Sequence, residues 1–113
     1  MLIYKIFKAD EWSELEAQGE TIGAPIDVTD GFIHFSTAEQ VVETANKHFA
    51  NQNNLFLISV DSSKLGSDLN WEKSRGGAMF PHLYRTLLLT DVARAQPLPL
   101  VDGYHQFPAD TGI

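Results

Sequence analysis

The sequence predicts an α+β fold: a single compact domain over residues 1–113, with a mixed or antiparallel split sheet and two main helices. Apolar runs of strand length precede, separate and follow two helical patterns, without a regular strand–helix–strand repeat. A chain of 113 residues with 43% hydrophobic residues can bury its own core. A doubly wound nucleotide-binding fold is therefore disfavoured.

The first half of the chain is expected to contain two strands and both helices. The first segment is apolar and of strand length, and Asp10 and Gly19 bound the helical run that follows it. Glycine, proline and aspartate then favour a loop, and the second helix has the clearest apolar stripe. In order, we expect a strand at Leu2–Lys8, a helix at Asp10–Gln18, a loop at residues 20–31, a short strand at Phe32–Phe35 and a helix at Thr37–Phe49.

The second half of the chain is expected to consist mainly of strands. Leu55–Val60 is almost entirely apolar, which is typical of a central strand covered on both faces. Leu69–Glu72 is a short strand, and the glycines at residues 74–78 predict a loop. Residues 81–89 and 92–98 are strands near an edge, because proline is usually confined to such places.

Composition excludes several classes of protein. The chain has no cysteine, so disulfides, thiolate metal ligands and a cysteine nucleophile are ruled out. We expect a cytoplasmic protein, because neither a signal peptide nor an apolar run of membrane-spanning length is visible. The net charge of -7 disfavours nucleic acid as a partner. Nothing in the sequence identifies a protein partner.

The first candidate site segment is His34-Phe35-Ser36-Thr37. In a strand, Ile33 and Phe35 point to one face while His34 and Ser36 point to the other, which would bring the histidine to a cleft. A partly buried, hydrogen-bonded histidine is the alternative. Ser36 and Thr37 also match a helix capping box, although a helix N-terminus can itself face an anion.

The second candidate segment runs from Glu72 to Tyr84. Arg75 can grip a phosphate or carboxylate, and Gly76 and Gly77 let the backbone approach a ligand closely. A surface Glu–Arg pair beside a flexible turn is the alternative. His82 and Tyr84 follow on one strand face and can supply stacking and a hydroxyl.

A metal site is another possible function of these residues. His34, His48, His82 and Glu72 would form a histidine and carboxylate set if the fold gathered them. No ligand spacing supports that arrangement, and His48 is better explained by its place near a helix C-terminus. We therefore expect no metal.

Residues 30–41 and 71–84 closely resemble two segments of the bacterial family called domain of unknown function 952, in the same order. Members of that family are similar in fold to ADP-ribosyltransferases. The resemblance implies that His34 orients the adenylate-side ribose of NAD, with Ser36 or Thr37 as the hydroxyl residue after it. It also implies that Glu72 stabilises an oxocarbenium ion and that Tyr84 stacks on nicotinamide.

Two functions therefore stand side by side. The first is a small-molecule-binding domain for NAD or another phosphate- or carboxylate-bearing ligand, with ADP-ribosyltransferase-like transfer catalysed by His34 and Glu72. Ser36, Thr37, Arg75, Gly76, Gly77, His82 and Tyr84 would bind the ligand. The alternative is a non-catalytic sensor module that uses the same cleft, and a structural protein whose histidines only satisfy buried bonds is a third reading.

Overall fold

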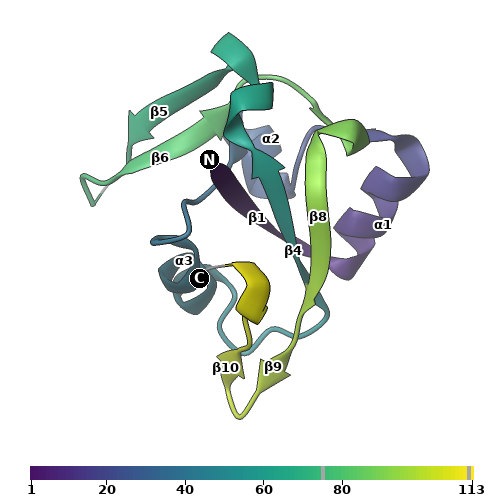
Figure 1. Cartoon of the computed structure of the whole chain (residues 1–113), viewed down its shortest axis with the longest axis vertical. Helices are drawn as coiled ribbons and strands as arrows, with labels where there is room; N and C mark the ends of the chain where they lie inside the picture. The colour runs from purple at the N-terminus through teal and green to yellow at the C-terminus, as the bar shows by residue number, and fades with distance from the viewer. Residues whose placement is uncertain (75, 112) are drawn as a thin grey trace.

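Three antiparallel strands cross the centre of the molecule in the computed structural model, in the order β1-β4-β8 (Figure 1). They span Leu2–Lys8, Leu55–Asp61 and Val92–Leu98. The structure describes residues 1–74, 76–111 and 113. The predicted central strand at 55–60 and edge strand at 92–98 are confirmed.

A second three-stranded sheet, ordered β3-β6-β5, lies beside this one. The β5–β6 hairpin projects from one side of the molecule, and a smaller hairpin of β9 and β10 projects near the chain end (Figure 1). All strand pairings among the described residues are antiparallel, so the sheets are split but not mixed. The remaining strands are β2 (Glu20–Thr21), β3 (Ile33–His34), β5 (Leu69–Lys73), β6 (Met79–Leu83), β7 (Leu87–Leu88), β9 (Leu100–Val101) and β10 (Tyr104–His105).

Among the described residues, three α-helices accompany the sheets, one more than predicted. The missed helix, α2, lies in the region expected to be a loop, and α3 begins four residues later than expected. None of the described helices has the length and apolar character needed to cross a membrane. The helices are α1 (Ala9–Gln18), α2 (Pro25–Asp30) and α3 (Val41–His48), with short 3-10 turns at Ser62–Lys64, Gly66–Asp68, Leu89–Asp91 and Ala109–Thr111.

Apolar side chains cover both faces of the central sheet. Ile3 and Phe7 of β1 pack with Leu15 of α1 and with Ile33 and Phe35 around β3. Because side chains alternate along a strand, the intervening residues of β1 face the other way. On that second face, β1 and β4 pack against α3. Lys5 shares the first face, and this places a charged group at the edge of the core.

The two main sheets join where β3 meets β1. Ser36 and Tyr4 exchange two backbone hydrogen bonds of 2.8 Å, so the chain after β3 runs antiparallel to β1. This junction brings Lys5 next to the segment that carries His34.

One prediction about strand position is wrong. Residues 81–89 were expected near an edge, yet β6 lies between β3 and β5 with Pro81 inside it. The N–H and C=O groups of one residue point to the same side of an antiparallel strand, and the Pro81 carbonyl accepts from Phe35 N at 3.0 Å. The donor that proline lacks therefore faces Phe35, just beyond the end of β3, so the missing ladder bond falls at the end of the pairing and not inside it.

Candidate functional site

Five side chains from β3, β5 and β6 and their ends form one group, here called the Phe32 cluster: Phe32, His34, Glu72, His82 and Tyr84. His34 and His82 are paired across β3 and β6, and their ring centroids are 5.3 Å apart. The Phe32 ring lies 4.2 Å from the His82 ring, 4.7 Å from the His34 ring and 5.2 Å from the Tyr84 ring. The fold thus brings together the two segments that the sequence singled out.

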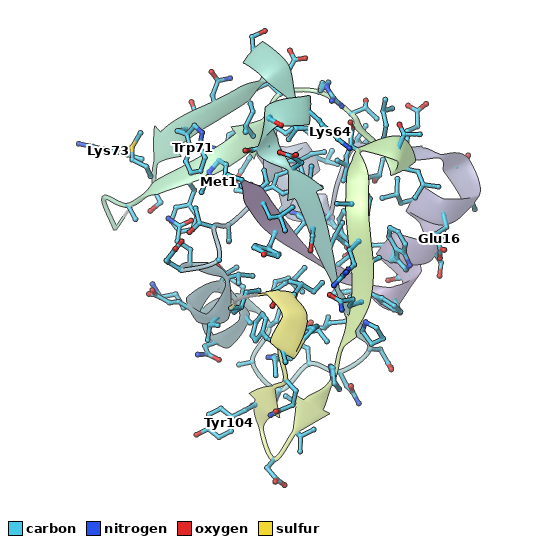
Figure 2. The ribbon with its side chains drawn as sticks, in the orientation of Figure 1. Met1, Glu16, Lys64, Trp71, Lys73 and Tyr104 are labelled. Carbon is cyan, nitrogen blue, oxygen red and sulfur yellow. The ribbon has the colours of Figure 1, made fainter. Side chains whose placement is uncertain are left out.

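Glu72 holds the β5–β6 side of this cluster. Its Oε1 accepts hydrogen bonds from the Tyr84 hydroxyl at 2.6 Å and from His82 Nδ1 at 2.8 Å. These bonds, that from Tyr84 first, hold the pKa of Glu72 below its usual range and raise the pKa of Tyr84. The neighbours of Glu72 along β5, Trp71 and Lys73, are marked in Figure 2 and point to the opposite face. The cluster therefore carries a solvent-accessible, ionised carboxylate.

A buried carboxylate, Asp27, holds the other side of the cluster. Asp27 accepts from Lys5 Nζ at 2.7 Å, from His34 Nδ1 at 2.6 Å, and from the backbone N–H groups of His34 and Ala24 at 3.0 and 2.7 Å. Its side chain has no exposed surface, and that of Lys5 is 7% exposed. We call Lys5, Asp27 and His34 the Asp27 clamp.

The charges of the clamp depend on one another. Burial alone would raise the pKa of Asp27, but the hydrogen bonds from His34 and Lys5, with the Lys5 charge, hold it below its ordinary value. Burial lowers the pKa of Lys5, and Asp27 opposes that shift. Each ion is therefore stabilised only while its partner remains in place.

His34 is held at both ring nitrogens. While Nδ1 contacts Asp27, Nε2 lies 2.9 Å from Asp30 Oδ2 at the end of α2. Two carboxylates therefore fix the orientation of the ring. Asp30 is the more accessible of the two partners.

Gly23 makes room for the clamp carboxylate. Its φ of +101° belongs to a region that side-chain-bearing residues rarely adopt, and a Cβ built there would lie 2.5 Å from Asp27 Oδ2. Only glycine therefore fits at position 23 while the backbone there lies this close to Asp27.

Several predicted ligand-binding residues lie apart from the Phe32 cluster. Ser36 is buried, and its hydroxyl lies 3.0 Å from Thr44 Oγ1 of α3. No side-chain bond caps α3. Thr37 donates its backbone N–H to Gln40 Oε1 at 3.0 Å, which is one half of the capping box predicted from Thr37 to Gln40. The Ser36 hydroxyl contacts Thr44 and does not cap the helix. Gly76 and Gly77 lie in the turn of the β5–β6 hairpin, and Arg75 lies outside the described residues.

Three residues of the site were missed from the sequence: Lys5, Asp27 and Asp30. Lys5 interrupts an apolar strand, and Asp27 lies third in a short helix that begins with proline. The position of Lys5 was a usable signal, because a charge inside an apolar strand needs a buried partner of opposite charge, and Asp27 was a candidate for that partner. Within the described ranges, no three His, Asp or Glu side chains are grouped so as to hold a metal ion.

Comparison with known proteins places this site in a family. Residues 6–95 match the family model described as "Protein of unknown function (DUF952)". The chain belongs to the DUF952 family. The match includes all five members of the Phe32 cluster, as well as Asp27 and Asp30. The family resemblance predicted from residues 30–41 and 71–84 is thereby confirmed.

Solved structures similar to this DUF952 chain come from one bacterial protein. The crystal structure of protein CC0527 from Caulobacter crescentus is 52% identical, with 94% of each chain covered and a TM-score of 0.89. The solution NMR structure of CC0527 is 51% identical, with 92% of this chain and 90% of that chain covered and a TM-score of 0.83. No curated protein matches the chain.

The first prediction concerns the clamp. Asp27→Asn should reduce the free energy of unfolding by about 3–5 kcal/mol, because it leaves the buried Lys5 ammonium without a counter-charge. Asp30→Asn is the matched control, and its loss of a half-exposed ion pair should cost about 0–1 kcal/mol. Urea unfolding at neutral pH measures both. Equal losses in the two variants would contradict the clamp.

Acid should remove the contribution of Asp27. Because its pKa is lower in the folded chain, ionised Asp27 stabilises the fold fully above the unfolded carboxyl pKa of about 3.9. That contribution is lost as the pH falls through the lower folded pKa. The stability difference between wild type and Asp27→Asn should shrink over this window in a urea titration series. A difference that stays constant into strong acid would show that the Asp27 charge is unimportant.

Proposed function

We propose that the chain binds a nucleotide at the Phe32 cluster, with NAD as the first candidate and ADP-ribosyltransferase-like transfer as the chemistry to test. The observation that carries this proposal is that His34 and His82 both lie against the Phe32 ring, and that His82 bonds Glu72. His34 and Glu72 are the two residues to which the resemblance assigns catalytic roles. Aromatic rings supply a stacking surface, and exposed carboxylates accept hydrogen bonds from ribose hydroxyls.

The charge of Glu72 fits the role of stabilising a cation. Cleavage of the bond between nicotinamide and ribose develops positive charge on the sugar, and a fixed carboxylate nearby lowers the energy of that state. Hydrogen bonds from Tyr84 and His82 favour the ionised form of Glu72 and fix its direction. The reaction would transfer ADP-ribose to water or to another nucleophile as nicotinamide leaves.

The ligand's phosphates require a cation that the described part of the cluster does not supply. Lys5 is buried against Asp27, and Arg85 contacts Asp91 and Asp68. Asp30 and Glu72 instead place carboxylates at the cluster. This supports a binding mode in which the Phe32 cluster contacts mainly the nucleoside half of the ligand. Arg75 is the proposed partner of the phosphates.

A non-catalytic sensor module is the second candidate, and the engagement of His34 favours it. Both ring nitrogens of His34 already contact carboxylates, so orientation of a ribose hydroxyl requires displacement of Asp30. Phe35, at a position where ADP-ribosyltransferases commonly have glycine, is packed in the core and does not enter the cluster. A module of this kind would bind the nucleotide and leave it intact.

Thermal shift with NAD, ADP-ribose and other adenine nucleotides tests binding. A ligand present at about 100 times its Kd should stabilise the fold by roughly 2.7 kcal/mol. For a chain of this length, that corresponds to a rise in Tm on the order of ten degrees. If no adenine nucleotide raises the Tm, the nucleotide proposal is wrong.

Release of nicotinamide separates catalysis from binding. Glu72→Gln should lower the release rate by about 100-fold or more while NAD still raises the Tm, because the stabilising charge is lost. Glu16→Gln, at an exposed position on α1 marked in Figure 2, is the matched control and should behave as wild type. A wild-type chain that binds NAD for hours without releasing nicotinamide would instead be a binding module.

A further inference from the structure

A pocket of about 300 Å³ opens beside the Phe32 cluster, next to α2. Its volume lies at the lower end of the range found for small-molecule sites. Most of its lining is apolar or aromatic. The residues that line it include Ile22, Val28, Phe32, Tyr84, Arg85 and Thr86.

Helix α2 exposes apolar side chains that a short helix would ordinarily bury, and one of them, Val28, lines this pocket. Its one buried residue is Asp27, while Ile26 and Val28 are 58% and 53% exposed. The clamp fixes this orientation, since Asp27 must point inward to reach Lys5 and His34. Val28 is thereby left at the pocket wall, where a flat apolar ligand would remove it from water.

The charged groups at the pocket are already paired. Arg85 donates to both carboxylate oxygens of Asp91, at 2.8 and 3.2 Å, and to the Thr86 carbonyl at 2.7 Å. Asp27 is held by Lys5 and His34. An uncharged ring is therefore better suited to this pocket than a phosphate or a pyridinium cation, because an ion would lose hydration without gaining a free counter-charge.

Phe32 and Tyr84 belong both to the pocket and to the Phe32 cluster. The Tyr84 ring lines the pocket, and its hydroxyl donates to Glu72 Oε1. The Tyr84 side chain therefore separates a ligand in the pocket from the Glu72 carboxylate. The pocket and the cluster form two adjoining parts of one surface.

We infer that this pocket binds an uncharged purine ring, with the attached ribose directed toward His34. The inference rests on the proposed nucleotide-binding function and assigns the adenine end of the ligand to the α2 side of the cluster. Val28, Ile22 and Thr86 then determine which ring is accepted.

A matched pair of substitutions on α2 tests this assignment. Val28→Trp places a large side chain in the pocket, whereas Ile26→Trp makes the same change at a similarly exposed position that does not line it. Val28→Trp should raise the Kd for NAD and adenosine about tenfold, the loss expected when one stacked base is displaced. Ile26→Trp should leave both values unchanged, and ribose 5-phosphate should bind all three chains equally.

Amide chemical shifts provide a second measurement that needs no substitution. Adenosine added to the wild-type chain should shift the amides of Val28, Phe32 and Thr86, whereas ribose 5-phosphate should act mainly near His34 and Glu72. If NAD binds equally to wild type and Val28→Trp, and these amides do not move, the pocket assignment is wrong while nucleotide binding stands. If only free adenine binds, and Val28→Trp abolishes it, the pocket stands and the proposed function fails. Absence of binding by all of these compounds would overturn both.

Discussion

The buried carboxylate of Asp27 is the constraint on which the rest of the site depends. An ion without exposed surface must have its hydrogen bonds and its charge satisfied from within the protein, and Asp27 obtains them from Lys5, His34 and two backbone N–H groups. These partners come from β1, which is distant in the sequence, and from the start of α2 and the neighbouring strand β3. Fixing one carboxylate thus fixes the position of α2, the direction of the His34 ring and the α2 side of the Phe32 cluster.

Much of the fold could be predicted, because most elements have strong apolar patterns. β4 was identifiable as a central strand from its nearly continuous apolar run, which arises because both of its faces contact a core cluster. Helix α2 could not be predicted from its apolar pattern. Its aspartate Asp27 is buried, whereas its apolar residues Ile26 and Val28 are exposed to solvent. Pro25 at its start and Gly31 after its end were the remaining signals. The position of β6 was also missed, because Pro81 indicated an edge strand.

The alternation of side-chain direction along the strands predicted part of the site. It placed His34 opposite Ile33 and Phe35, which are indeed in the core, and it put His82 and Tyr84 on one face. Alternation failed at Ser36, because β3 ends at His34 and the next residues pair with β1 near α3. The role of Asp27 could not be read from local spacing, since its counter-ion Lys5 is brought to it by the junction between two sheets. Ligand binding by these residues stays a prediction.

A carbon-13 NMR titration of the Asp27 carboxyl group tests the central claim most directly. In the wild-type chain its midpoint should lie below the ordinary aspartate pKa of about 3.9, because His34 and Lys5 stabilise the ionised form. In His34→Gln the midpoint should rise, since one of the strongest donors to the carboxylate is replaced. A wild-type midpoint at or above the ordinary value, unchanged by His34→Gln, would contradict the account that a buried, ionised Asp27 organises this site.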